Sequence, residues 1–408
     1  MLTLKNALAL LEDNKNKVNS FILYIISVMC ALNVLLINNA TIDKLCIAAC
    51  AALTMILFFL NIERLKIWQL VLLWANFISL AVTLGANRGE GIGLVLGVLF
   101  LILSLTMFNS IAFDKKTVFI CRFIMAIAIV FLMITSKFKF STGNTWIFAY
   151  DIFGDVINNN TVCILLVFLS LLAVILLNSW FDDEKFSWLS TVIYGAATIS
   201  GAIMIYTLSG RIALISIAAF FMLTVFRFIK ISTRLYKAAC ISMFVLALLV
   251  PVVYVYLYGQ IGNFTLMGKS FFSGRQIIWQ SAFEQIQSHP IFGSGTSMPL
   301  DTVAQGTTQS AHNVMVGLWK SVGIIPMVSV VIFFFTRRSR YMRIEDCACI
   351  SLLVIMFTES FFADSRFTFL LLVFLLRSHG EVEELSKSRI RLWIEAHLPK
   401  KKGETAVK

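Results

Sequence analysis

The stretch Ala238–Tyr258, AACISMFVLALLVPVVYVYLY, is uncharged and long enough to cross a bilayer as a single helix. It is followed by Gly259–Ala311, the longest stretch of the chain that is not apolar, and another hydrophobic segment begins at His312. Hydrophobic segments on both sides indicate a membrane protein whose long polar loop lies at one surface. We therefore expect the chemistry of the protein in and around this loop.

The composition of the chain excludes an ordinary soluble domain. Of its 408 residues, 59% are hydrophobic and 14% are charged, and the mean hydropathy is +0.87; soluble domains carry about 25% charged residues. The net charge of +12 would favour nucleic-acid binding in a soluble protein, but positive residues in a membrane protein mark cytoplasmic loops. The composition therefore predicts an all-α, polytopic protein in a lipid bilayer, with no nucleic-acid partner.

Repeated apolar runs predict about 12 transmembrane helices and a long extracytoplasmic loop that carries short helices. No cleavable signal peptide is expected, because Met1–Asn19 is polar and the first apolar run already spans. The expected spans are Ser20–Ile37, Leu45–Leu60, Ile67–Leu84, Ile92–Phe108, Val118–Ile134, Thr161–Leu177, Leu189–Leu208, Ile212–Ile229, Ala238–Tyr258, His312–Phe335, Cys347–Phe362 and Phe367–Leu376.

The distribution of Lys and Arg predicts which loops lie inside. With the amino terminus in the cytoplasm and strict alternation of sides, most of the 34 Lys and Arg residues fall on cytoplasmic segments. Both termini are then cytoplasmic, and Arg377–Lys408 forms a cytoplasmic tail after a hairpin that turns at Asp364-Ser365-Arg366. Residues 1–408 form a single integral membrane domain, whose long outer loops are Lys137–Asn160 and the catalytic loop Gly259–Ala311.

The cysteines and histidines give no sign of a disulfide framework, a metal site or a cofactor. The eight cysteines lie in or near apolar segments, and none lies in either long outer loop. Cys347-Ala348-Cys349 lacks both a histidine partner and the spacing of a metal site. We expect small apolar side chains there, and neither metal nor cofactor elsewhere.

Arg211 follows the short turn Leu208-Ser209-Gly210 between two predicted spans. An arginine at this depth is costly unless it faces a water-filled cavity or an anion. The alternative is a side chain that extends to the lipid headgroups from a short turn. Arg211 is therefore a candidate ligand for an anion.

Arg275 opens a predicted helix in the long loop, with Ser273 as its N-cap and Trp279, Phe283 and Ile286 on one apolar face. Such a helix would lie on the membrane surface and direct its amino end at an anion. Guanidinium binds phosphate oxygens in a bidentate manner, which suits a diphosphate. The alternative is an ordinary surface arginine on an interfacial helix.

His312 lies where the loop re-enters the membrane, beside Asn313. Histidine titrates near neutral pH, so His312 is a candidate general base for a sugar hydroxyl; the alternative is a histidine that caps or hydrogen-bonds the start of a helix. His289, before Pro290, is interpreted as a turn residue. Lys320 lies on the same helical face as His312 and about 12 Å deeper, so it extends the cationic surface or indicates that the helix begins later.

Together these motifs resemble the O-antigen ligase/polymerase superfamily of bacterial surface-polysaccharide assembly. The similarity rests on the outer-turn arginine, Arg275-x3-Trp279, Pro290-Ile291-Phe292-Gly293-x-Gly295, His312-Asn313 before a span with Gly317 and Gly323, and the run Asn158-Asn159-Asn160. It is concentrated in Asn158–Pro326. The family usually has Ser or Thr directly before the arginine, whereas Gly210 stands here, which puts the register of Arg211 in doubt.

The resemblance implies a C-type glycosyltransferase in the bacterial cytoplasmic (inner) membrane, working on the outer side without metal or nucleotide sugar. Its donor would be an oligosaccharide on undecaprenyl diphosphate, and its acceptor a glycan hydroxyl. By motif, His312 resembles the general base, and Arg211 and Arg275 resemble the diphosphate-binding arginines. Lys320, Asn313 and Asn160 are secondary candidates.

Three functions remain open at this point. A polymerase joins repeat units, with a chain-length regulator as an expected partner, and the Asn run favours it slightly. A ligase transfers the finished glycan to lipid A–core sugar. A transporter or flippase of lipid-linked sugars would show charged residues at mid-membrane and pseudo-symmetric halves, whereas the first five spans are almost free of charge.

Overall fold

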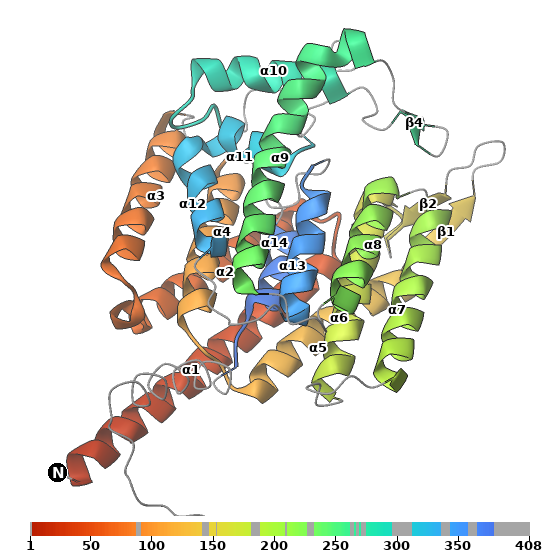
Figure 1. Cartoon of the computed structure of the whole chain (residues 1–408). Coiled ribbons are helices and arrows are strands. Elements are labelled where there is room, and N and C mark those ends of the chain that lie inside the picture. Colours follow the sequence, from red (N-terminus) through yellow and green to blue (C-terminus); the bar gives the residue numbers. More distant parts are fainter. Residues whose placement is uncertain are drawn as a thin grey trace, which may run out of the picture.

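The computed structural model of the chain consists mainly of helices (Figure 1). It describes residues 2–86, 91–140, 147–151, 153–180, 188–208, 210–226, 232–261, 265–266, 269–270, 275–295, 312–335, 343–357 and 365–378. The helices are α1 (Leu2–Leu35), α2 (Ala40–Leu60), α3 (Ile67–Ala86), α4 (Ile92–Ser110), α5 (Lys115–Thr135), α6 (Asn159–Trp180), α7 (Trp188–Thr207), α8 (Arg211–Phe226), α9 (Thr233–Ile261), α10 (Arg275–Ser288), α11 (Val314–Val322), α12 (Ile324–Phe335), α13 (Ile344–Ile355) and α14 (Ser365–Leu375), with a 3₁₀ turn at Ile62–Arg64.

Seven helices among the described residues are long and apolar enough to cross a membrane, judged by length and composition. They are Glu12–Leu35, Ala40–Leu60, Ile67–Ala86, Ile92–Ser110, Lys115–Thr135, Asn159–Ser179 and Arg234–Leu257. Shorter apolar helices cover Val192–Thr207, Arg211–Val225 and Ile324–Phe334. The chain is therefore a multi-pass helical membrane protein, while the count of about 12 spans stays a prediction.

Contacts between loops define the two ends of the bundle. Lys15 pairs with Glu63, so the amino-terminal part of α1 lies beside the α2–α3 connection. After α4, the backbone N–H of Phe113 donates to the Arg377 carbonyl at 2.8 Å. Because α3 and α4 run away from this end and back again, both contacts lie at one end, the tail end. The opposite end, where α10 lies in Figure 1, is the loop end.

The loops predicted to lie together on the outer side do meet at the loop end. The Asn38 side-chain amide, between α1 and α2, donates to Asp151 at 2.8 Å, and the Thr83 hydroxyl, near the end of α3, donates to the Phe292 carbonyl at 2.6 Å. The relative sidedness of these segments is thus as predicted. Which end faces the cytoplasm stays a prediction.

The described residues are mainly helical, in agreement with the predicted all-α fold, and the loop Lys137–Asn160 also contains a small antiparallel sheet. Its strands β1 (Lys137–Phe140), β2 (Ile147–Tyr150) and β3 (Val156–Ile157) pair in the order β1-β2-β3, and β4 (Thr265–Leu266) pairs with β5 (Lys269–Ser270) in the second loop. The sequence of β1, KFKF, alternates polar and apolar residues, as strands do.

The centre of the bundle holds α13 and α14, whose described side chains are nearly all buried, together with the stretch Phe100–Phe108 of α4, which is buried throughout. α13 and α14 are two separate helices, as the predicted hairpin requires. Its predicted turn is wrong for Ser365 and Arg366, because both belong to α14; Asp364 lies outside the described residues. Helices that are apolar on every side need a buried position, which explains their place in the core.

All eight cysteines are buried with free thiols. Two of them approach each other, with 3.6 Å between the Cys30 and Cys50 sulfurs of α1 and α2. The cysteines therefore pack as small apolar side chains, the role expected for Cys347 and Cys349.

Candidate functional site

The helix α10 lies across the loop end, above the ends of the other helices (Figure 1). It begins at Arg275 as predicted, and its buried residues are Arg275, Ile278, Trp279, Ala282 and Ile286. Trp279 and Ile286 were expected on the apolar face, while Phe283 is only half-buried. Trp279 meets Tyr254 of α9 edge to face, with ring centroids 5.8 Å apart. These contacts hold the amino end of α10, and with it Arg275, against the bundle.

The segment after α10, Pro290–Gly295, is joined to the end of α11 backbone to backbone. The Ser294 N–H donates to the Lys320 carbonyl at 2.7 Å, and the Gly295 N–H donates to the Ser321 carbonyl at 3.0 Å. The Trp319 indole Nε1–H donates to the Pro290 carbonyl at 2.9 Å. The Pro/Gly motif therefore has a structural role in fastening α11 beneath α10. His289 lies in the bend that precedes the motif and is exposed, which confirms it as a turn residue.

Two glycines make this close approach possible. Gly323 has a φ of +87°, and a Cβ there would lie 1.9 Å from the Ile291 carbonyl oxygen. Gly293 has a φ of +73°, and its Cβ would lie 2.6 Å from the Gly323 nitrogen. Any side chain at either position would overlap backbone atoms, and both φ values are costly for residues with a Cβ.

The predicted single span His312–Phe335 is wrong, because the chain breaks at Gly323 into α11 and α12. Instead of crossing the membrane, α11 lies across the bundle under α10 (Figure 1). Lys320 is buried in the last turn of α11, level with Ser294. Its displacement from His312 therefore runs along the loop end, and the expected greater depth is not observed. The helix α9 extends to Ile261 and so includes Gly259, the first residue of the predicted loop.

Asn313, rather than His312, caps α11. Its side-chain oxygen accepts from the Val316 N–H at 3.0 Å, which is the usual N-cap bond. Its amide nitrogen donates to the Ala247 carbonyl of α9 at 2.8 Å and to the Phe357 carbonyl after α13 at 3.2 Å. Asn313 is fully buried and ties three helices together. The structure thus gives Asn313 a positioning task and rejects the cap as the explanation of His312.

His312 precedes this cap with a φ of +46°, the left-handed region that non-glycine residues rarely occupy. Among the described residues it is the one non-glycine residue with a positive φ. Such conformations persist where the surroundings enforce them, and they concentrate at functional sites. Here the hydrogen bonds of Asn313, the next residue, hold the backbone beside His312, whose side chain is half-buried.

Arg211 begins α8, and the structure explains the glycine before it. A Cβ on Gly210 would lie 2.4 Å from the Cys163 sulfur of α6. Only glycine fits between α6 and α8, so the departure from the family pattern reflects helix packing. Asn160 lies three residues before Cys163, in the first turn of α6 and one turn nearer the loop end. Asn158 accepts from the Asn160 N–H at 2.8 Å, so part of the Asn run serves to start α6.

The structure brings Arg211 and Arg275 together from distant parts of the chain. Their positive charges act on each other across the amino ends of α8 and α10. Both side chains are at least partly buried, and Arg275 is only 9% exposed. Two guanidinium groups that repel each other, at two helix amino ends, form a site suited to an anion.

His312 belongs to the same end of the bundle. Val316 of α11 packs in one cluster with Ile278, Ala282 and Ile286 of α10. The later residue Trp319 reaches Pro290, beyond the end of α10, so α10 and α11 run in the same general direction. Their amino ends, which carry Arg275 and His312, therefore lie toward the same side.

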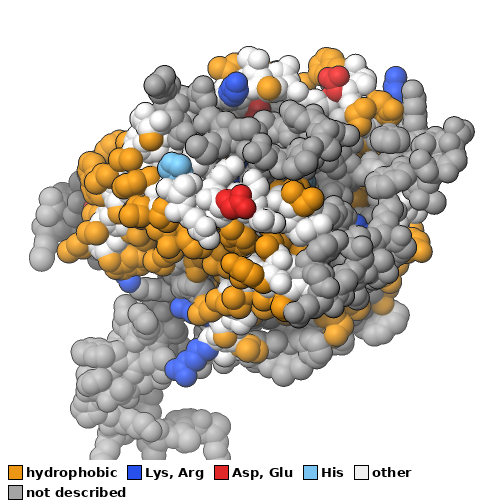
Figure 2. Space-filling model, turned by 90° about the horizontal axis from the view of Figure 1, so that it is seen from above, with side chains coloured by type: hydrophobic (Ala, Val, Ile, Leu, Met, Phe, Trp, Pro, Cys, Tyr) orange, Lys and Arg blue, Asp and Glu red, His pale blue; other side chains and the backbone are white. Residues whose placement is uncertain are grey.

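A view onto the loop end, Figure 2, shows hydrophobic side chains along the flank and polar surface gathered toward the middle. Within the described ranges, no group of three or more His, Cys, Asp or Glu residues is placed to hold a metal ion. The charged residues at the amino ends of α8 and α10, Arg211 and Arg275, are both cationic, so this part of the arrangement suits a phosphate-bearing ligand.

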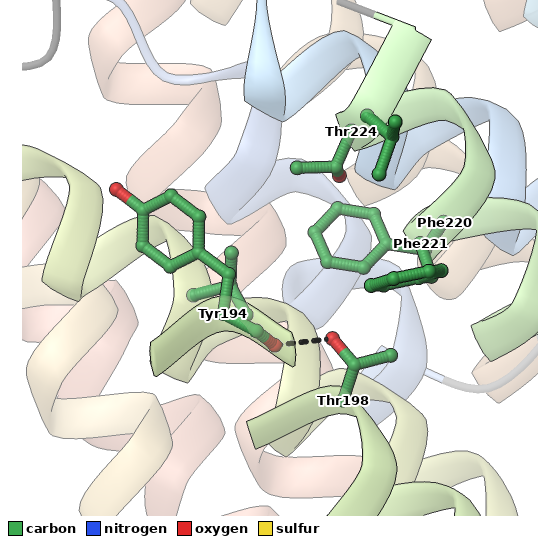
Figure 3. Close-up of a pocket in the computed structure, with 7 residues that line it drawn as sticks. Tyr194, Thr198, Phe220, Phe221 and Thr224 are labelled. Atoms are coloured by element: carbon green, nitrogen blue, oxygen red, sulfur yellow. Dashed lines mark hydrogen bonds between the residues drawn. The ribbon is translucent and has the colours of Figure 1, made fainter. Parts of the chain in front are cut away.

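A small apolar niche lies elsewhere, between α6, α7 and α8 (Figure 3). Its walls include Tyr194, Phe220, Phe221 and Thr224, and the Thr198 hydroxyl beside it donates to the Tyr194 carbonyl at 2.7 Å. These residues face the tail-end half of α8, remote in sequence from Arg211. The niche is therefore separate from the cationic site.

The sequence did not reveal the packing roles of Gly210 and Gly323, or that the backbone carbonyls of Met356 and Phe357 belong to this region. A glycine in an apolar run is a weak signal, because it also occurs within uninterrupted spans. The predictions for Ser209, Ser273, residues 296–311 and the tail from residue 379 lie outside the described residues.

Fold and site together define a polytopic helical membrane protein with a cationic site at one end of the bundle. Residues 195–331 match the family model described as O-antigen ligase, which supports the predicted O-antigen ligase/polymerase superfamily. The match runs from α7 into α12 and includes Arg211, Arg275 and His312, and it implies a glycosyltransferase-like membrane enzyme. No curated protein matches the chain.

Proposed function

We propose that this protein transfers a glycan from undecaprenyl diphosphate to an acceptor sugar hydroxyl during assembly of a bacterial surface polysaccharide. The observations that carry the proposal are that Arg211 and Arg275 begin α8 and α10 and that their positive charges lie near enough to act on each other. Such a pair binds a diphosphate and stabilises the negative charge that it gains on leaving. The match to O-antigen ligases supports the same chemistry.

In the proposed reaction, the acceptor oxygen attacks the anomeric carbon of the donor sugar in one step with inversion. The bond from that carbon to the diphosphate oxygen breaks, and undecaprenyl diphosphate leaves with the bonding electrons. His312 takes the proton of the acceptor hydroxyl as the new bond forms. Arg211 and Arg275 hold the diphosphate, and Lys320 adds positive charge along the same layer. No step requires a metal ion or a cofactor.

The proposed setting is the bacterial cytoplasmic membrane, with the loop end outside and both termini, including Arg377–Lys408, in the cytoplasm. About 12 spans form one integral domain, and Gly259–Ala311 is its extracytoplasmic catalytic loop. The lipid-linked donor then reaches Arg211 and Arg275 from the outer leaflet. The acceptor glycan approaches His312 from outside.

We prefer a polymerase, which joins repeat units and works with a chain-length regulator, because the run Asn158-Asn159-Asn160 lies at the start of α6, on the same side as the cationic site. The second candidate is a ligase onto lipid A–core sugar, and the description of the matching family favours it. Purified protein separates the two: a polymerase elongates lipid-linked repeat units alone, whereas a ligase requires the core acceptor.

The role of His312 is tested by His312→Ala in a strain that lacks its own copy of the gene. We expect transfer to fall by about 10²–10⁴-fold, because general-base catalysis contributes this much. The matched control is His289→Ala, which removes an exposed imidazole in the bend after α10 and should leave transfer intact. Long surface glycans at normal protein level in the His312→Ala strain would contradict the proposal.

A further inference from the structure

The central helix α13 touches both parts of the candidate site, and an ion pair holds it at the opposite end of the bundle. Its first turn lies at the tail end, and its last turn lies beneath the start of α11. Over Ile344–Ile355 the axis rises by about 17 Å.

Just after its carboxyl end, α13 is bound to Asn313 and Val314, the two residues that follow His312. The Val314 N–H donates to the Met356 carbonyl at 3.1 Å. The Asn313 side chain donates to the Phe357 carbonyl at 3.2 Å. Both bonds satisfy carbonyls at a helix end inside the bundle, where water cannot. The end of α13 therefore fixes the backbone that carries His312.

In its middle, α13 is bound to α8. The Ser216 hydroxyl donates to the Ser351 carbonyl at 2.7 Å, and both residues are fully buried. Ser216 lies five residues after Arg211, about 7–8 Å along α8. A shift of α13 along its axis would therefore change the position of His312 relative to Arg211.

At its amino end, α13 is held by Arg122 of α5. The Arg122 guanidinium contacts the Glu345 carboxylate at 3.1 Å, and the two side chains are only 7% and 13% exposed. The Nε–H of Arg122 also donates to the Val373 carbonyl of α14 at 3.3 Å. Asp346 accepts from the Arg343 N–H at 2.8 Å, so two carboxylates lie at the positive end of the α13 dipole.

We propose that Arg122 and Glu345 are positioning residues for the glycosyl-transfer site at the opposite end of the bundle. They fix the position of α13 along its own axis. Through the Met356, Phe357 and Ser351 carbonyls, α13 in turn fixes the separation between His312 and Arg211. A buried ion pair suits this task, because it tolerates only one register of the two helices, and losing one partner strands a charge. The proposal rests on the proposed function for its catalytic consequence alone.

The test compares Arg122→Gln, Glu345→Gln and the double variant in purified full-length protein in lipid nanodiscs. Amide hydrogen exchange is measured over residues 312–322, and glycan transfer is measured with undecaprenyl-diphosphate-linked substrate. Each single variant should exchange about tenfold faster over residues 312–322 and transfer more slowly. The double variant, which strands no charge, should recover part of both values. Lys17→Gln, which breaks the exposed pair of Lys17 with Asp13, is the matched control and should change neither.

The two readouts separate the failure of this proposal from the failure of the proposed function. Faster exchange confined to residues near 345, with residues 312–322 unchanged, would overturn the positioning role. Wild-type protein without any transfer activity would overturn the proposed function, while the exchange data would still decide the coupling. If the single variants do not fold, Ser216→Ala removes the middle tie without stranding a charge. It should raise the KM for the lipid-linked donor several-fold, and an unchanged KM would count against α13 as the link to Arg211.

Discussion

The helices α1 to α5 and the helices α10 to α14 are built in opposite ways. Each of the first five contains an apolar stretch long enough to cross a membrane without interruption. The last five have between 9 and 14 residues in the structure, and the chain changes direction between them. Polar side chains in the first group bond to each other within the wall, as Asn19 does with Asn61 at 3.1 Å. In the second group, polar side chains such as that of Asn313 bind backbone groups at helix ends.

This difference shows how a membrane protein can house polar chemistry. A helix end leaves backbone N–H and carbonyl groups without partners, and lipid offers none. In this protein the start of α11 and the end of α13 satisfy each other through Asn313 and the Met356 carbonyl. The continuous helices form the membrane-spanning frame of the bundle, and the ends of the interrupted helices place polar groups inside it.

The largest effect is expected for a substitution at Gly323, where the chain breaks between α11 and α12. Gly323→Ala should cost roughly 2–5 kcal/mol, because the residue has a positive φ and the new Cβ would lie 1.9 Å from the Ile291 carbonyl oxygen. The measurement is thermal unfolding of the purified protein in detergent, together with its level in the membrane.

Gly85→Ala in the continuous helix α3 is the matched control. A Cβ at Gly85 meets no atom within 4 Å, and alanine is the better helix former by about 0.5–1 kcal/mol. We expect this variant to be as stable as the wild type or slightly more so. Equal tolerance at both glycines would show that the junction at Gly323 is not needed.

Much of this contrast could be predicted from the sequence where residue type alone decides. Charge placement gave the relative sides of the loops, and Arg275 was expected at the start of a loop helix. Arg211 was assigned to a short turn, and the structure places it at the head of α8. Arginine at a membrane boundary is unusual enough to mark its surroundings.

The interruption of His312–Phe335 could not be predicted, because hydropathy does not report the direction of a helix. Only the contact of Gly323 with the Pro290–Gly295 segment shows that the chain turns there. The same limit applies to Lys320, whose depth was derived from a helix that crosses the membrane, whereas α11 lies along the loop end. In the sequence, Gly210 is a departure from the family motif, and its close packing against Cys163 explains that departure.

The second prediction compares two arginines, Arg275 of α10 and Arg64, which lies between α2 and α3. If Arg275 binds a diphosphate through its fork, Arg275→Lys keeps the charge but loses the bidentate geometry. We expect transfer to fall about 10–100-fold, equivalent to roughly 1.4–2.8 kcal/mol, with protein level unchanged. The measurement is the initial rate of transfer against donor concentration.

Arg64→Lys is the control for this substitution, because Arg64 pairs with Glu12 at the tail end. A charge-keeping change at a surface pair should leave transfer unaffected. Full activity of Arg275→Lys would rule out bidentate binding at that residue and leave Arg211 as the principal diphosphate ligand.

The smallest expected effect compares two buried threonines. The Thr224 hydroxyl, beside the niche of Figure 3, is buried and has no hydrogen-bond partner among the described residues. The Thr54 hydroxyl of α2 donates to the Cys50 carbonyl at 2.8 Å. Thr224→Val should stabilise the protein by about 0.5–1 kcal/mol, because it removes a buried polar group that lacks a partner. Thr54→Val should lower the free energy of unfolding by about 1 kcal/mol, because it removes a buried hydrogen bond.

Thermal unfolding of the two variants in the same detergent measures both effects. A loss of stability in Thr224→Val equal to that in Thr54→Val would mean that the Thr224 hydroxyl is hydrogen-bonded in the membrane. The partner would then be water or lipid that enters the niche between α6, α7 and α8. In that case the tail-end half of α8 is wetter than its apolar lining implies, and the interrupted region would extend further from the loop end than the helix breaks alone indicate.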